Sequence, residues 1–475
     1  MKKNRIKYQF SLKSKEELEQ LTHEELLKYV NDLQDNSIQE KPPKNCPEAK
    51  LRKCPRGTNN SSISPSSEIA PPKKRNNKNQ SLREKSNKSV GGQLGRDGVT
   101  LLQSDTPDEI VTLPYSLTHC KKCNVDISTV VAKLKERRQV LDIELSSIAH
   151  KITEYQSFSK KCFSCGYENH DNSSFTIAPN ISYGSTVIAM VAYLSVSQYM
   201  SNMRIVELMK NLFNIKLSEG SITGLLAKAS KLSLSTIDRI TTILEQVPII
   251  GIDETGCKIN SFKYWHWTFQ NERNTLIIAN KSRGTKVINN TFENGFKNAC
   301  VVHDNYSSYS SLECKSEQLC LAHKMRDLNY AIECEGTKLM KDIKTLLKEA
   351  IRDDKESLSS TQRVLLKAQY DKMLQHLLSM PYIEKSETHK QIKSLTKSKD
   401  KLFTFLLDEN IPADNNGSER AIRNVKVKQK VSGQFKSLEG AQNYANLRSV
   451  IDTSRKRGLN EFESLVSIMQ GNSLF

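Results

Sequence analysis

The chain has 475 residues, which is enough for two to four domains and for a sizeable hydrophobic core in at least one of them. Its formal net charge of +18 indicates a polyanionic partner, foremost nucleic acid, although ribosomal and membrane-surface proteins carry similar charge. No apolar stretch approaches membrane-spanning length and the start MKKNRIKYQFSL lacks the apolar stretch of a signal peptide, so we expect a cytoplasmic protein whose eleven cysteines are thiols or metal ligands.

Two segments precede the first Cys-x-x-Cys motif. Residues 1–40 predict short amphipathic helices, because Leu26, Val30 and Leu33 recur at helical spacing. Between residues 41 and 110 the composition shifts to Lys, Arg, Ser, Asn and Pro, and basic residues outnumber acidic ones. This composition predicts a disordered basic arm that becomes ordered on nucleic acid, with a plain solubilising linker as the alternative.

Residues 111–172 contain two Cys-x-x-Cys motifs, HCKKC at 119–123 and CFSC at 162–165. Four thiolates are the tetrahedral set that a structural Zn²⁺ prefers. The gap between the motifs exceeds the usual ribbon spacing, so we expect an inserted hairpin, with strand-like alternation at 150–158. A thioredoxin-like redox pair is the alternative, but neither motif lies in a strand–helix–strand pattern. The sequence therefore predicts a zinc-ribbon-like module whose ligands are Cys120, Cys123, Cys162 and Cys165.

Residues 173–246 show helical apolar periodicity. The stretch RIVELMKNLFNIKLSEGSITGLLAKASKL predicts a helix, a turn and a second helix that begins after Ser218 as N-cap. A DNA-binding motif and ordinary helix packing are both compatible with this pattern.

After Pro248 the period changes to that of strands. VPIIGIDETGCKI, KYWHWTFQN and NTLIIANKS predict three consecutive strands, and we expect Trp265 and Trp267 of the second strand to lie in the core. GTKVINNTFENG predicts a helix, NACVVHDNYSSY a fourth strand, and SEQLCLAHKMRDLNYAIE a fifth strand that leads into a helix. This order is the one expected of a ribonuclease-H-like α/β core over residues 247–335 and 408–475, interrupted by a helical insertion at 336–407. The predicted fold class is therefore multidomain α+β.

Three carboxylates in this core are candidates for a catalytic metal site. Asp253 and Asp304 each follow an apolar strand, where an unpaired carboxylate is costly, and Glu419 lies in the first turn of a helix that must return to the same sheet. Hard oxygen ligands in this number suit a pair of Mg²⁺ ions about 3.5–4 Å apart, which can drive phosphodiester displacement. Glu254 is left out of this set, because it should point to the opposite face of the strand.

Four motifs resemble the transposases of the bacterial insertion-sequence family IS66: DETG at 253–256, HDNYSSY at 303–309, CLAHKMRDL at 320–328 and NNGSERAIRN at 415–424. The resemblance extends upstream to GGQLGRDG and the paired Cys-x-x-Cys motifs, and downstream through QFKSLEGAQNYANLRSVIDTSRKRGL. It thus covers roughly residues 58–470.

The resemblance implies a DDE transposase in which Asp253, Asp304 and Glu419 hold Mg²⁺ or Mn²⁺. It also implies that the basic neighbours of Glu419, among them Arg423, face DNA, and that Lys426, seven residues past Glu419, contacts DNA or is a plain surface lysine. Similar enzymes carry a pair such as Cys320 and His323 after the second aspartate, for which a structural pair, a zinc site completed by further ligands, or support of the active site are all open.

The implied activity is hydrolytic cleavage at the 3′ ends of an insertion sequence, followed by strand transfer into target DNA. The implied partners are element ends, target DNA, further copies of the chain on DNA and possible accessory proteins, in the cytoplasm of a bacterium at the nucleoid. A ribonuclease-H-like nuclease without strand transfer and a non-catalytic zinc-dependent DNA-binding protein are the alternatives.

Overall fold

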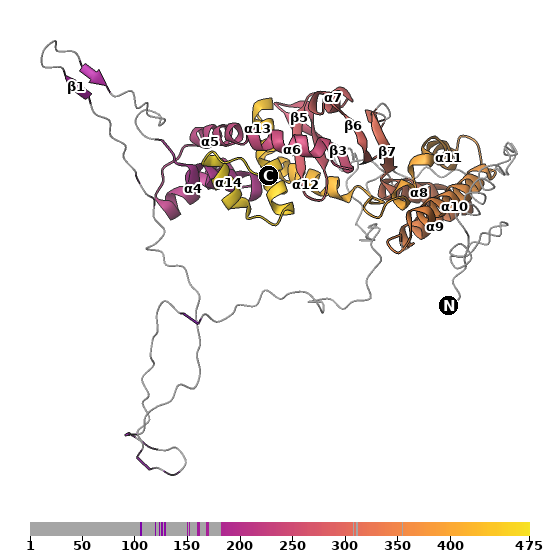
Figure 1. Cartoon of the computed structure of the whole chain (residues 1–475), viewed down its shortest axis with the longest axis horizontal. Helices are drawn as coiled ribbons and strands as arrows, with labels where there is room; N and C mark the ends of the chain where they lie inside the picture. The colour runs from indigo at the N-terminus through magenta and orange to yellow at the C-terminus, as the bar shows by residue number, and fades with distance from the viewer. Residues whose placement is uncertain are drawn as a thin grey trace. The chain divides into compact units, whose positions relative to one another are not determined.

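The computed structural model describes residues 182–475 except 307, 310, 311 and 354, together with two short strands and a few single positions between 105 and 170. The chain divides into two compact units, of which the smaller comprises Arg83–Glu154 and Leu212–Asn214. The central sheet and nearly all helices belong to the larger unit (Figure 1). The predicted helices of residues 1–40 and the basic arm of 41–110 lie outside the described residues, apart from isolated positions of the arm.

Two short antiparallel strands, β1 (Ser159–Lys161) and β2 (Glu168–His170), precede the larger fold. They flank, in the sequence, the segment that contains Cys162 and Cys165, which itself lies outside the described residues, as does most of the predicted strand at 150–158. The zinc-ribbon-like module therefore stays a prediction.

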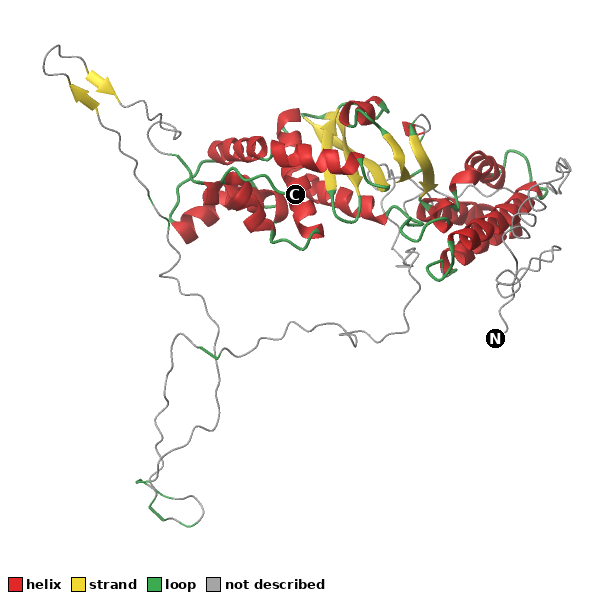
Figure 2. Cartoon of the chain, in the orientation of Figure 1, coloured by secondary structure: helices red, strands yellow, loops and turns green. Residues whose placement is uncertain are grey.

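A five-stranded mixed sheet forms the centre of the larger unit (Figure 2). Its strands lie in the order β5-β4-β3-β6-β7. The first three form an antiparallel meander, whereas β6 and β7 run parallel to β3. The bounds are β3 Ile249–Ile259, β4 Phe262–Gln270, β5 Thr275–Asn280, β6 Phe296–His303 and β7 Cys314–Leu319, with the short helix α7 (Lys286–Thr291) between β5 and β6. The strands and the helix predicted for this region are confirmed.

The hairpin between β3 and β4 turns at Asn260 and Ser261, whose φ angles are 46° and 68°. Two consecutive residues with positive φ match the twist that a tight hairpin needs, and Asn adopts this conformation more readily than most residues. The two tryptophans of β4 differ in burial. Trp267 is fully buried as expected, whereas Trp265 is only partly buried and lies under the guanidinium of Arg283.

Helix α13 (Leu438–Lys456) covers the free edge of the sheet at β5. Its side chains accept hydrogen bonds from outward-facing backbone N–H groups of the strand: Ser449 Oγ from Ile277 at 2.8 Å and Thr453 Oγ1 from Thr275 at 3.1 Å. An edge strand with unpaired N–H groups is a template for association with other chains, so these hydrogen bonds close one edge of the sheet.

The helices before the sheet pack on the C-terminal helices. They are α3 (Ser185–Ala192), the π-helix η3 (Tyr193–Ser197), α4 (Asn202–Phe213), α5 (Glu219–Leu232) and α6 (Leu234–Glu245), and α14 (Glu461–Met469) packs on α3. Ser218 caps α5 as predicted, because its side chain accepts a hydrogen bond from the N–H of Ser221 at 3.0 Å. The helix, turn and helix are confirmed, and their contact with DNA stays a prediction.

The segment between β7 and the returning helix α12 (Asn416–Ser432) is helical, as predicted for the insertion. Its helices are α8 (Leu321–Glu335), α9 (Lys338–Arg352), α10 (Ser360–Ser379) and α11 (Glu387–Ser398), followed by two short 3-10 helices, η5 (Lys399–Lys401) and η6 (Thr404–Leu406). Leu346, Leu374 and Leu395 of these helices share one hydrophobic core with Cys300 and Leu319 of the sheet. The insertion is thus packed onto the sheet through α8 and β7. Within the described part of the chain, no helix is both long and apolar enough to span a membrane.

Candidate active site

Asp253 and Asp304 lie just beyond the paired part of two neighbouring parallel strands. Asp304 directly follows β6 as expected, whereas Asp253 lies inside β3, which continues to Ile259, so the expectation that Asp253 follows a strand end is wrong. Gly251 of β3 pairs with Val302 of β6, and each aspartate lies two residues beyond this pair. Adjacent strands are about 4.8 Å apart, so the register brings the two aspartates side by side. Asp253 Oδ1 accepts a hydrogen bond from the N–H of Glu254 at 2.9 Å, and Asp304 Oδ1 accepts one from the N–H of Tyr306 at 3.1 Å.

The electrostatics of Asp253 indicate a concentration of negative charge. Burial raises the pKa of Asp253 well above its ordinary value, and the charges of Asp304, Glu254 and Glu419 raise it further. All these effects disfavour the charged form of the carboxyl group. A cation at this position would relieve the repulsion, and carboxylate oxygens are the ligands that Mg²⁺ prefers. The donor set therefore fits a hard divalent cation.

Helix α12 brings Glu419 to the face of the sheet that carries Asp253. Gly251 lies on this face, and a Cβ atom there would come within 2.8 Å of Asn415 Oδ1 and 2.7 Å of Ser418 Oγ. The start of α12 thus packs directly against the backbone of β3, and only a residue without a side chain permits this approach. Asp253 follows Gly251 by two residues and shares its face.

Asn415 links the start of α12 to the strand of Asp253. It occupies the N-cap position, but its buried side chain makes no capping hydrogen bond. Instead its Nδ2 donates to the carbonyl of Ile252 at 2.7 Å, and its Oδ1 accepts from Ser418 Oγ at 2.6 Å. Its own carbonyl accepts from the N–H of Glu419 at 3.1 Å. One side chain therefore connects the residue before Asp253 with the turn that carries Glu419.

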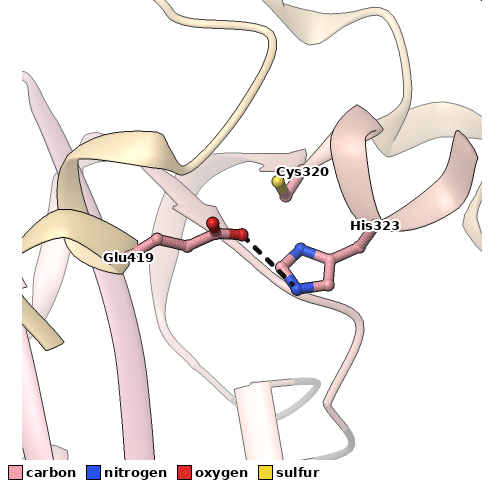
Figure 3. A group of neighbouring side chains, drawn as sticks. All are labelled: Cys320, His323 and Glu419. Atoms are coloured by element: carbon pink, nitrogen blue, oxygen red, sulfur yellow. Dashed lines mark ion pairs between the residues drawn. The ribbon is translucent and has the colours of Figure 1, made fainter. Parts of the chain in front are cut away.

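Two helices hold the carboxylate of Glu419. Arg326 of α8 contacts Oε1 at 2.9 Å. His323 Nε2 lies 3.7 Å from the same oxygen, as the dashed line in Figure 3 shows. Arg423, one turn further along α12, lies 3.8 Å from Oε2 and is largely exposed.

Cys320, His323 and Glu419 form a compact group of potential metal ligands. One ligand atom of each lies within 4.8 Å of the other two, and no further group of three such side chains occurs among the residues that the structure describes. The three carboxylates of the predicted set accordingly do not meet within this distance of one another. They share a face and interact electrostatically, while Glu419 points toward α8.

A protein-family model described as Transposase IS66 family matches residues 180–443. The chain belongs to this family. None of the curated proteins matches it. The transposase role agrees with the resemblance carried by the four sequence motifs, which lie within the matched region.

In this transposase Glu254 has partners outside the predicted carboxylate set, although its charge, like that of Asp304, raises the pKa of Asp253. Its buried carboxylate pairs with Arg283 Nη2 at 2.6 Å and accepts a hydrogen bond from the hydroxyl of Tyr309. Glu254 therefore has its own counter-ion in Arg283.

The two residues predicted to contact DNA are placed differently. Arg423 is exposed beside Glu419, with Nη2 at 3.8 Å from Oε2. Lys426 is half-buried and donates from Nζ to the carbonyl of Gly256 at 2.7 Å, and burial lowers its pKa. The ammonium group of Lys426 is therefore hydrogen-bonded to the backbone of β3.

Of the four predicted zinc ligands, Cys123 is exposed, and Cys120, Cys162 and Cys165 lie outside the described residues. The described residues therefore do not test whether these four cysteines form one site.

Sequence reasoning missed Arg326 and Asn415. Asn415 had a local signal, because an Asn before a helix start is a typical N-cap, but its actual use, to anchor the helix on β3, had none. Arg326 is the sixth residue of α8 and lies 93 positions before Glu419, so no spacing rule connects the two.

Proposed function

We propose that this transposase cleaves the 3′ ends of an insertion sequence in a Mg²⁺-dependent reaction and joins them to target DNA. The observation that carries the proposal is the register of β3 and β6, which sets Asp253 and Asp304 side by side, with Glu419 on a helix packed against the same face. The strand order β5-β4-β3-β6-β7 further supports a ribonuclease-H-like core over residues 247–335 and 408–475, with residues 336–407 as the insertion.

Asp253, Asp304 and Glu419 would hold Mg²⁺ or Mn²⁺. When bound, such ions activate the attacking oxygen and stabilise the leaving oxygen in an in-line displacement at phosphorus. The chain itself contributes position: Asn415 and Gly251 fix the distance between α12 and β3, and Arg326 orients the carboxylate of Glu419. Arg423 supplies positive charge at the rim, where the DNA backbone would lie.

Both proposed reactions use the same bond changes. In cleavage, the oxygen of water forms a bond to phosphorus and the 3′ oxygen of the element leaves with a proton. In strand transfer, the freed 3′ hydroxyl attacks a phosphodiester of the target, and a 5′ fragment of target DNA is released at its 3′ oxygen. No covalent protein–DNA bond is formed, so one carboxylate set serves both reactions.

Further parts of the proposal concern binding. We propose that Cys120, Cys123, Cys162 and Cys165 hold a structural Zn²⁺ and that this module, the basic arm of 41–110 and helices α4 and α5 hold element ends. The protein would act as a homo-oligomer on DNA, with accessory proteins as optional partners, in the bacterial cytoplasm.

The test is a cleavage and strand-transfer assay on labelled element ends with the purified full chain. Asp253→Ala and Asp304→Asn should abolish both reactions while DNA binding in a mobility-shift assay is largely retained. Asp342→Asn on α9, which removes a carboxylate outside the set, should cleave normally. If Asp253→Ala cleaves as well as the wild type, or loses DNA binding together with cleavage, the assigned role is wrong. Pre-cleaved ends that are bound but never joined to target would identify a nuclease without strand transfer.

A further inference from the structure

The group formed by Cys320, His323 and Glu419 combines sulfur, nitrogen and oxygen donors beside the proposed magnesium site. We propose that it is a second metal site, which takes a thiophilic divalent cation such as Zn²⁺ and competes with Mg²⁺ for Glu419. The existence of the site stands on its own geometry, and its inhibitory effect rests on the proposed function of Glu419.

The donor types select the cation. A thiolate, an imidazole and a carboxylate are all ligands of Zn²⁺, whereas Mg²⁺ takes oxygen ligands. Two N or O ligands of a tetrahedral zinc lie about 3.3 Å apart, because each is about 2.0–2.1 Å from the ion. His323 Nε2 and Glu419 Oε1 are 3.7 Å apart, so the pair needs to close by only a few tenths of an ångström. With three protein ligands, the fourth position would remain open to water or to a phosphate oxygen.

The helix dipole and a hydrogen bond at Cys320 favour a metal-bound thiolate, whereas burial opposes it. The residue is the N-cap of the 15-residue helix α8, where the helix dipole favours negative charge. Its buried Sγ accepts a hydrogen bond from the N–H of Asn415 at 3.2 Å. A hydrogen bond to a coordinating sulfur orients it and stabilises its charge. In the metal-free protein burial raises the pKa of Cys320 to about 12, so binding of a cation would release the thiol proton.

The starts of two helices converge at the group: Cys320 is the N-cap of α8, His323 lies in the first turn of α8, and Glu419 comes from α12 (Figure 3). The positive charge that opposes cation binding at this group is that of Arg326, which contacts Glu419 Oε1 at 2.9 Å. The side chain of Arg326 is 22% exposed, so it can swing toward solvent when a cation takes its place. The need to displace this ion pair makes the site weaker than a four-cysteine structural zinc site.

The consequence is competition. Glu419 cannot point toward Cys320 and His323 and at the same time complete a set with Asp253 and Asp304, since the three carboxylates do not meet in the geometry in which the first group is assembled. Bound zinc would therefore hold Glu419 away from the magnesium set and lower the rate of DNA cleavage.

The binding test uses Co²⁺ as a spectroscopic probe on the full chain. Thiolate-to-cobalt absorption reports the coordinating sulfur directly, and the predicted Cys-x-x-Cys module contributes a constant background. Wild-type protein should show one more thiolate-bound cobalt than Cys320→Ser. Cys314→Ser, which removes a half-buried cysteine of β7 outside the group, should behave like the wild type. Equal cobalt spectra for wild type and Cys320→Ser would overturn the proposal.

Two further measurements guard against a folding defect in Cys320→Ser. Cadmium-113 NMR of the unmodified wild type distinguishes a site with one thiolate from a site with four. A spectrum that contains the four-thiolate signal but no one-thiolate signal would count against the proposal. Glu419→Gln should also lose the additional cobalt, and cobalt binding that survives this change would exclude the glutamate as a ligand.

The competition test measures the Zn²⁺ concentration that halves Mg²⁺-dependent cleavage. It should rise by at least about tenfold in Cys320→Ser relative to wild type and Cys314→Ser. Equal sensitivity of all three proteins to zinc would overturn the competition. If the chain cleaves no DNA at all, the proposed function fails, but the cobalt spectra still decide whether the metal site exists.

Discussion

The side-chain amide of Asn415 donates a hydrogen bond of 2.7 Å to the carbonyl of Ile252, the residue that precedes Asp253. The two residues are 163 positions apart in the chain. Through this bond the helix that carries Glu419 is fixed to the strand that carries Asp253. The distance between two of the proposed metal ligands therefore depends on one buried side chain that is not itself a ligand.

Replacement of Asn415 should lower the stability of the protein and the rate of DNA cleavage, but not its affinity for DNA. In Asn415→Ala the carbonyl of Ile252 loses its donor, and we expect a loss of about 1–3 kcal/mol in the free energy of unfolding. A shift of Glu419 by about 1 Å would lower the cleavage rate by up to about 100-fold, with DNA affinity almost unchanged. Single-turnover cleavage and mobility-shift assays measure the two effects. Asn410→Ala, which changes an exposed turn before the helix, is the matched control, and an Asn415→Ala protein that cleaves at the wild-type rate contradicts the positioning role.

Gly251→Ala should disturb the docking of α12. The new Cβ would lie 2.5 Å from Gln270 Nε2 and 2.7 Å from Ser418 Oγ, closer than real Cβ contacts. Overpacking of this kind costs about 1–3 kcal/mol, and it should lower the melting temperature and the cleavage rate together.

The control lies on the same strand. In Gly256→Ala the new Cβ would meet Lys263 Cε at 3.6 Å, an ordinary contact, so stability should be unchanged or slightly higher. Equal melting temperatures for the two variants would show that the approach of α12 to β3 is looser than the structure indicates.

Arg326→Gln should change the dependence on magnesium. The guanidinium contacts Glu419 Oε1 at 2.9 Å and so competes with any cation for this oxygen. Without it, the Mg²⁺ concentration for half-maximal cleavage should fall, even if the maximal rate also falls because Glu419 is less well oriented. Lys338→Gln, which removes an exposed charge from α9, should leave the Mg²⁺ dependence as in the wild type. A higher Mg²⁺ requirement in Arg326→Gln would argue that the arginine assists metal binding instead.

The stability of the protein should fall in mild acid because of His266. This histidine is fully buried between the rings of Phe435 and Tyr444, and burial lowers its pKa from 6.5 to about 4. Between these two values the unfolded state binds a proton that the folded state does not, so stability is lost as the pH falls from 6.5 toward 4. The difference between the two pKa values corresponds to about 3 kcal/mol.

Urea unfolding at several pH values tests this expectation. His266→Phe should flatten the dependence of stability on pH in this window. An equally steep dependence in His266→Phe would assign the acid sensitivity to other groups.

Much of the fold could be predicted because it depends on local periodicity. Alternation marked the strands β3 to β5, and the apolar spacing of residues 336–407 marked the helices of the insertion. The incomplete burial of Trp265 under Arg283 could not be predicted, because strand alternation assigns a face but not what covers it. The packing of distant segments decides whether a helix or a single arginine side chain covers a strand face.

The sequence by itself determined the family, through four motifs in a fixed order, and the residue types of the candidate site. Only the tertiary structure decided which partners those residues have: Arg326 for Glu419 across 93 positions, Gly256 for Lys426 across 170, and Cys320 and His323 as neighbours of a carboxylate assigned to another metal. The physical reason is that periodicity is set by bonds along the chain, whereas these partners are set by strand register and by how closely α12 packs on β3. A single buried glycine and a single buried amide control that approach, and neither leaves a pattern that spacing could reveal.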